Sequence, residues 1–253
     1  MASLSSLKGK KAIVLGGTSG IGLATCRQLL ERGATVLAYS RSQEKCNAAI
    51  ALLATTQAAG GGSFAAQSLD VLDRSRLEAA FVENKGFDYL VAAATGGSRA
   101  LGPFLEMDLD GFQNSFAKLW GYANAIRLGA PHMNHAGGGA IVLVSGSPAK
   151  KCKPGYVALS CVGGAVENLV RALAVELRDK NLRINGVSPG LIDTPMFEAK
   201  GDGKAAFLAK ATAANPVPRA GTADEVAAGI VFALTNEFVT GTIIDVDGGA
   251  AVP

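Results

Sequence analysis

The stretch LGGTSGIG at residues 15–22 follows a strand-like run, KAIVL at residues 11–15, and leads directly into a helical pattern. Glycines at these positions let the backbone turn tightly and approach a pyrophosphate, whose charge then lies at the positive end of the helix. An ordinary tight turn also uses glycine, but the strand before it and the helix after it are the context that a dinucleotide needs. The stretch therefore predicts a dinucleotide site that includes Gly16, Thr18, Ser19, Gly20, Ile21 and Gly22.

Outward from this stretch, apolar runs of strand length alternate with helix-length segments that have apolar residues three and four apart. Such alternation requires crossover connections and predicts a parallel sheet with helices on both faces. No linker or repeat divides the chain, so we expect one doubly wound α/β domain over residues 1–253. The seven predicted strands are residues 11–15, 35–39, 64–69, 89–93, 140–144, 183–187 and 242–246.

Residues 191–219 depart from this alternation. Short helical stretches there are not followed by a strand, and the segment carries Gly201, Gly203, Pro216 and Pro218. Irregular segments of this length in compact domains are often functional lids. We therefore expect a mobile lid over the substrate.

Composition excludes several classes of protein. With 49% hydrophobic and 18% charged residues, the 253-residue chain can bury a large core, which excludes disorder. The 24 basic and 21 acidic residues are interspersed, which argues against a nucleic-acid partner. Apolar stretches end well before 18 residues and the start of the chain lacks an apolar signal core, so we expect no membrane span and action in the cytoplasm. Four cysteines without Cys-x-x-Cys spacing and two histidines predict neither a metal site nor disulfides.

The spacing Gly16-x-x-x-Gly20-Ile21-Gly22 resembles the short-chain dehydrogenase/reductase family, and further landmarks extend the resemblance over nearly the whole chain. It implies one Rossmann-type domain with strand order 3-2-1-4-5-6-7. Asp70-Val71 resembles the pair that contacts adenine, and Ala93 lies in the segment that ends the fourth strand. Pro189-Gly190 followed by Ile192 and Thr194 resembles the loop beside the nicotinamide. The further cofactor-binding residues implied are Asp70, Val71, Ala93, Pro189, Gly190, Ile192 and Thr194.

The end of the second predicted strand bears on the choice of cofactor. An acidic residue is expected there when the ribose diol of NAD must be bound, but the sequence reads Tyr39-Ser40-Arg41. A hydroxyl and a guanidinium suit a 2′-phosphate through charge-assisted contacts. The alternative is that Arg41 is a solvated residue that opens the next helix. With Lys45 nearby, Ser40 and Arg41 predict NADP.

The resemblance fails at the catalytic pair. In the family, a Tyr and a Lys four residues later perform the acid/base work, and the aligned positions here are Leu159 and Gly163. The family's serine aligns at or beside Gly146, which Ser145 and Ser147 flank. A leucine cannot exchange a proton and a glycine supplies no cation, so the usual mechanism is absent.

Lys118 is the candidate replacement, because it aligns with the family's supporting Asn on the preceding helix. A partly desolvated Lys118 would orient the ribose or a substrate oxygen and could itself donate a proton. Alternatively, it extends to solvent from a helix that merely packs. Ser145 and Ser147 can bond a carbonyl or cap a turn, and Tyr156 can reach the substrate or pack at the pocket mouth. The candidate catalytic residues are therefore Lys118, Ser145, Ser147 and Tyr156.

Three functions remain open at this point. The first is an NADP(H)-dependent oxidoreductase that acts on a small, largely apolar carbonyl, imine or alkene. The second is a non-redox enzyme, such as a cyclase or isomerase, on the same scaffold, and the third is a non-catalytic nucleotide-binding protein. The helices expected near residues 111–133 and 156–179 carry more apolar surface than one sheet face needs, and in relatives they form a dimer bundle. We therefore expect a homodimer or homotetramer.

Overall fold

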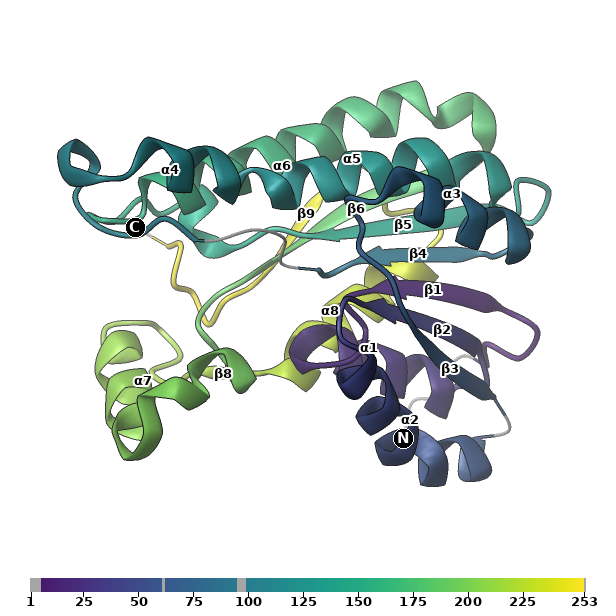
Figure 1. Cartoon of the computed structure of the whole chain (residues 1–253), viewed down its shortest axis with the longest axis horizontal. Helices are drawn as coiled ribbons and strands as arrows, with labels where there is room; N and C mark the ends of the chain where they lie inside the picture. The colour runs from purple at the N-terminus through teal and green to yellow at the C-terminus, as the bar shows by residue number, and fades with distance from the viewer. Residues whose placement is uncertain (1–5, 61, 95–98, 253) are drawn as a thin grey trace.

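The computed structural model describes residues 6–60, 62–94 and 99–252, and for residues 199 and 200 the backbone alone. Its centre is a seven-stranded parallel sheet in the order β3-β2-β1-β4-β5-β6-β9 (Figure 1). This is the predicted order, with β9 as the seventh strand of the sheet. The strands are β1 Lys11–Leu15, β2 Thr35–Ser40, β3 Ser63–Ser68, β4 Tyr89–Ala92, β5 Gly139–Val144, β6 Leu182–Pro189 and β9 Ile243–Val246.

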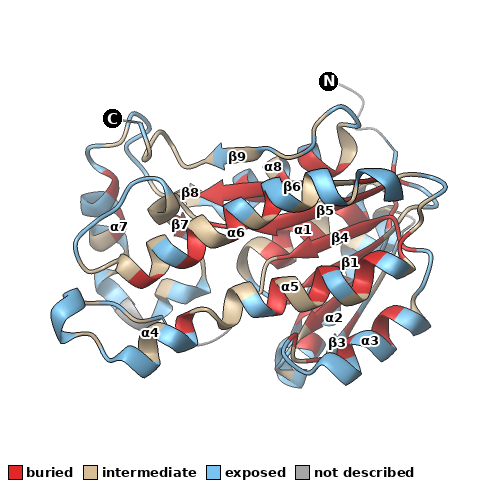
Figure 2. Cartoon of the chain, turned by 90° about the horizontal axis from the view of Figure 1, so that it is seen from above, coloured by how far each residue is buried: buried red, intermediate tan, exposed pale blue. Residues whose placement is uncertain are grey.

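Helices cover both faces of the sheet (Figure 1). Successive side chains of β1 point to opposite faces, so Ala12 and Val14 join one core cluster while Ile13 and Leu15 join the other. The first cluster packs under α1 Gly20–Glu31, α2 Gln43–Gly60 and α8 Ala223–Thr235. The second packs under α3 Arg74–Glu83, α5 Ala117–Gly129 and α6 Val157–Glu176. Figure 2 shows that the inner strands β1, β4, β5 and β6 are mostly buried, whereas the edge strand β9 is not.

Parallel pairing gathers the carboxyl ends of the strands at one edge of the sheet. In the register, Leu15 of β1 lies opposite Tyr39 of β2 and Ala92 of β4. On the other side of β4, Val144 of β5 lies opposite Val187 of β6. Loops that follow neighbouring strand ends therefore meet at one place, which is where ligands bind in open α/β sheets.

Residues 191–219 form a separate layer beside this edge. The predicted absence of a strand here is wrong, because β7 Ile192–Asp193 pairs in parallel with β8 Gly221–Thr222. Strands of two residues are too short to give an alternating pattern, so the sequence does not reveal them. Between them lie a 3-10 segment, η5 Pro195–Gly203, and α7 Lys204–Thr212. The Lys204 ammonium joins these parts through ion pairs of 2.7 Å to Asp193 and 2.6 Å to Glu198.

The remaining elements are short. They are α4 Leu109–Ser115 and the 3-10 turns η1 Phe104–Glu106, η2 Ala130–His132, η3 Ser147–Ala149 and η4 Arg178–Lys180. Among the described residues, no group of three or more His, Cys, Asp or Glu is placed to hold a metal ion.

One described helix, α6, is long and apolar enough to cross a membrane by length and composition, which the sequence reading did not anticipate. In the fold, its Val166 and Val170 are fully buried in the core under the sheet. Core helices of globular proteins pass the same test, so the finding is weak evidence for a span.

Candidate functional site

A cavity of about 450 Å³ lies at the carboxyl edge of the sheet. Its lining comes from the loops after β1, β2, β3, β4, β5 and β6, together with α5 and the start of η5. The predicted site residues that line it are Gly16, Thr18, Ser19, Gly20, Ile21, Gly22, Ser40, Arg41, Asp70, Val71, Ala93, Lys118, Ser145, Pro189 and Thr194.

The glycine turn between β1 and α1 is shaped by close backbone approaches. Gly16 has φ +83°, and a Cβ there would lie 2.6 Å from the amide nitrogen of Ala94. A Cβ on Gly22 would lie 2.1 Å from the carbonyl oxygen of Gly16. Ser19 stands at the helix N-cap without a side-chain capping bond, and the first turn holds no acidic residue. The positive end of α1 therefore faces the cavity and suits a pyrophosphate.

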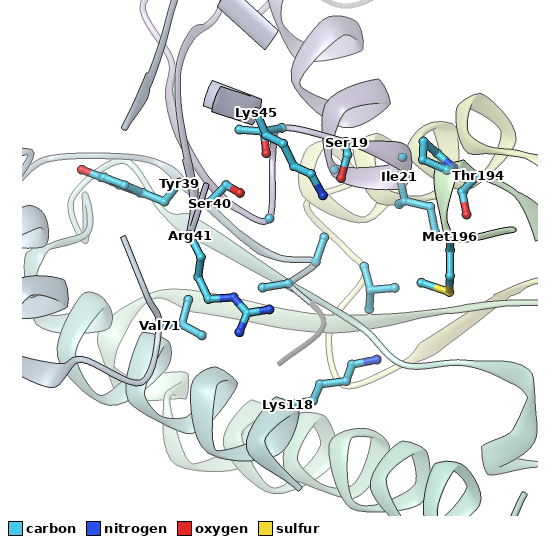
Figure 3. A pocket seen from close by; sticks show the side chains of 18 of the residues that line it. Ser19, Ile21, Tyr39, Ser40, Arg41, Lys45, Val71, Lys118, Thr194 and Met196 are labelled. Atoms are coloured by element: carbon cyan, nitrogen blue, oxygen red, sulfur yellow. The ribbon is translucent and has the colours of Figure 1, made fainter. Parts of the chain in front are cut away.

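At the end of β2, the cavity wall is cationic. Ser40, Arg41 and Lys45 all line it, and Figure 3 shows Arg41 and Lys45 extending into the cavity from this side. Asp70 is the only acidic residue among the described lining residues, and its Oδ1 accepts a 3.0 Å hydrogen bond from the backbone amide of Leu72. Among the described residues that line the cavity at the end of β2, none carries a carboxylate that would compete with a 2′-phosphate.

Lys118 enters the cavity from α5 (Figure 3). Its Nζ donates a 3.0 Å hydrogen bond to the carbonyl oxygen of Ser145 and lies 5.6 Å from the ring centroid of Tyr122. Desolvation, with a further contribution from the positive charge of Arg99, lowers the pKa of Lys118 to about 7. An amine with this pKa exchanges a proton easily near neutral pH.

Ser145 lines the cavity, but its hydroxyl is already engaged. The hydroxyl donates a 3.1 Å hydrogen bond to Oε1 of Glu167, which is buried on α6. The other carboxylate oxygen of Glu167 lies 3.7 Å from Nη2 of Arg171. The contribution of Ser145 to the cavity therefore includes its carbonyl oxygen, which accepts from Lys118.

Four predicted residues do not line the cavity. Ser147 begins η3, and Tyr156 is the N-cap residue of α6. Gly190 packs behind the wall, where a Cβ would lie 2.7 Å from the carbonyl oxygen of Asp247. Ile192 is buried in the core cluster beneath α1 and α8.

Arg99 is the main cavity residue that sequence reasoning missed. Its Nη1 donates a 2.7 Å hydrogen bond to Sδ of Met196 on η5, which also lines the cavity. The available signal in the sequence is a cation soon after the end of β4. Arg99 lies outside the motifs that carry the family resemblance, so these motifs do not indicate it.

The chain is similar to known proteins over nearly its whole length. Residues 16–251 match the family model described as enoyl-(acyl carrier protein) reductase. The chain is 34% identical, over 99% of both chains, to the oxidoreductase asL5 of Sarocladium schorii. It is also 34% identical to the cis-4-hydroxycyclohexanecarboxylate dehydrogenase of Sinomonas cyclohexanicum, over 94% of this chain and 95% of the relative.

A solved structure is similarly close. The NADPH-bound short chain oxidoreductase of Pseudomonas aeruginosa PAO1, described as containing an atypical catalytic center, is 30% identical. The match covers 98% of this chain and 99% of that one, with a TM-score of 0.90. Family model, relatives and fold agree over nearly the whole length. The chain belongs to the short-chain dehydrogenase/reductase family of oxidoreductases.

Proposed function

We propose that the protein is an NADP(H)-dependent oxidoreductase that acts on a small, largely apolar carbonyl, imine or alkene, with Lys118 as proton donor. One observation carries this proposal. The Lys118 amine lies in the cavity, 3.0 Å from the Ser145 carbonyl oxygen, in a chain that lacks the family's usual acid/base pair.

The cofactor part of the proposal is supported by the cationic wall at the end of β2. Ser40, Arg41 and Lys45 offer a hydroxyl and two positive charges to a 2′-phosphate. The close-packed turn at Gly16 and Gly22 would hold the pyrophosphate against the N-terminus of α1. The similar Pseudomonas oxidoreductase is described as NADPH-bound. When bound, the cofactor supplies the hydride.

Lys118 would supply the proton for the reduction. With a pKa of about 7, its ammonium gives up a proton at low cost and regains one from solvent between turnovers. The Ser145 carbonyl oxygen holds the ammonium in place, and the charge of Arg99 favours the neutral amine that remains after transfer. In a carbonyl reduction, the hydride goes to carbon and this proton to oxygen.

The substrate part is supported by the cavity and by one relative. Val144, Pro195 and Met196 contribute apolar surface near Lys118 on the substrate side. The Sinomonas relative is named for a hydroxylated cyclohexanecarboxylate, which is a small, mostly apolar ring. A similarly small substrate with few polar groups suits this cavity.

We also propose that the protein is a homodimer or homotetramer. A second hollow, of about 650 Å³, runs between α5 and α6 on the outer face. An apolar hollow of this kind favours burial against a second copy. The apolar side chains that line it include Ala123, Ile126, Leu169, Leu173 and Leu177.

The test of the proposed function follows NADPH consumption against a panel of carbonyl, imine and alkene compounds, with NADP and NAD binding measured in parallel. Turnover that depends on Lys118 is the expected result. Tight NADP binding without turnover across the panel would favour a non-redox or non-catalytic role instead. Failure to bind either nucleotide would overturn the cofactor assignment.

A further inference from the structure

The cavity contains a second cation, Arg99, and the proposed function gives its guanidinium no ligand. Resting on that proposed function, we propose that Arg99 determines substrate specificity by binding a carboxylate on the substrate. The substrate would then be a small apolar acid that also carries the reducible group.

Local contacts fix the segment that follows Arg99, which lines the cavity. The backbone amide of Ala100 donates a 3.0 Å hydrogen bond to the hydroxyl of Ser115, at the end of α4. The amide of Gly102 donates a 3.0 Å hydrogen bond to the carbonyl oxygen of Gly155, just before α6. Arg99 therefore begins a segment fixed between α4 and α6, and its guanidinium reaches Met196 of η5.

The described residues around the Arg99 guanidinium offer it few hydrogen-bond acceptors and no carboxylate. A thioether is a weak acceptor, whereas a guanidinium has five N–H donors in a planar fork. None of the ion pairs among the described residues includes Arg99 or Lys118. The electrostatic partners of Arg99 are Lys118, which repels it, and the phenols of Tyr122 and Tyr156. This end of the cavity thus carries positive charge without a described carboxylate to balance it.

The phosphates of the cofactor do not account for this charge. The turn before α1, together with Arg41 and Lys45 on the β2 side of the cavity, would hold these phosphates, whereas Lys118 enters from α5 (Figure 3). A carboxylate fits Arg99 because two parallel N–H···O bonds match the guanidinium fork. It would replace the Met196 thioether as acceptor, and its charge would balance that of the cavity.

The test compares a keto acid with its uncharged ester, using 4-oxopentanoate and methyl 4-oxopentanoate with NADPH. In the wild type, kcat/KM for the acid should exceed kcat/KM for the ester by about ten- to a hundredfold. Only the acid makes a charge-assisted bond to Arg99. Arg99→Gln should bring this ratio close to one, and Arg99→Lys should restore part of it. Arg178→Gln is the matched control, because the Arg178 side chain is 73% exposed and lies outside the cavity, and it should keep the wild-type ratio.

A binding measurement separates this proposal from the proposed function. Calorimetric titration of the NADP-loaded protein with benzoate and benzamide needs no turnover. If no compound is reduced but benzoate binds more tightly than benzamide and Arg99→Gln removes the difference, the carboxylate site stands while the redox role fails. Equal binding of the two ligands, or an acid-to-ester ratio that Arg99→Gln leaves unchanged, would overturn the carboxylate site.

Discussion

Gly163 of α6 packs directly against Ala149 of η3, so that a Cβ at position 163 would lie 2.9 Å from the Cβ of Ala149. The sequence resemblance predicts that the family's catalytic lysine aligns with position 163. The turn after β5 therefore crowds the first carbon of any side chain at position 163, and such a side chain would require η3 to shift.

Gly163→Ala should lower the free energy of unfolding by about 1–3 kcal/mol, because the added methyl group overpacks the contact with η3. Gly164→Ala is the matched control, since a Cβ there meets nothing within 4 Å. That change should raise the free energy of unfolding by about 0.5–1 kcal/mol through helix propensity. Urea unfolding of both variants measures the difference. Equal effects would show that η3 yields freely to the methyl group.

Lys118→Met keeps the length of the side chain and removes its charge, so turnover should fall by about 10²–10⁴ if the lysine donates the proton. Steady-state rates with the best compound of the panel provide the measurement. Lys85→Met, an exposed lysine far from the cavity lining, should retain the wild-type rate. A loss confined to cofactor affinity would reduce Lys118 to a positioning group.

The lowered pKa of Lys118 also predicts how the rate depends on pH. Reduction needs the ammonium, so kcat in the reductive direction should fall as the pH rises through about 7. In the oxidative direction the neutral amine is the base, and the dependence should reverse. A flat profile across this range would argue against a proton transfer by Lys118.

The free energy of unfolding should also depend on the protonation of Lys118. The folded pKa lies below the unfolded one, so the unfolded state binds more protons between pH 7 and 10.5, and wild-type stability gains with pH there. Lys118→Met removes the cost of burying the charged ammonium, so it should stabilise the fold. This stabilisation should be largest near pH 6 and shrink as the pH rises. Thermal unfolding of both proteins at pH 6 and pH 9 also verifies that the variant folds.

Arg41→Ala should cost about 1.5–3 kcal/mol of NADPH affinity while leaving NADH affinity nearly unchanged, because it removes a charged partner of the 2′-phosphate alone. Fluorescence titration with each nucleotide measures both affinities. Arg74→Ala, an exposed arginine on α3, serves as the control for loss of general positive charge. A wild-type preference for NADH would contradict the assignment.

Leu173→Asp should convert the proposed homodimer or homotetramer into smaller species, because it puts a charge into the apolar hollow between α5 and α6. Light scattering at micromolar concentration measures the mass against the 25.7 kDa of one chain. Leu52→Asp on α2, where the leucine is 63% exposed, should leave the assembly intact. A wild-type mass of one chain would refute the proposed assembly.

The sequence by itself determined the order of the seven strands in the main sheet and the lining of the cavity next to β1 and β2. The run at residues 11–15 is β1 as predicted, and the glycine turn after it is followed at once by α1. These features are readable because apolar periodicity and turn chemistry are local properties of the chain. The carboxyl edge then follows from the parallel topology, which brings Ser40 and Arg41 to the same cavity as Gly16.

Only the tertiary structure decided the part of the cavity that contains Lys118 and Arg99. Whether Lys118 extends to solvent or into the cavity depends on how α5 packs, and no local pattern reports it. Arg99 lines the same cavity, and Ser115 and Gly155 anchor the residues that follow it. The contact between Gly163 and Ala149 likewise depends on the packing of two separate elements, α6 and η3. Such contacts arise from the packing of whole elements, so the chemistry of this centre becomes visible only when the chain is folded.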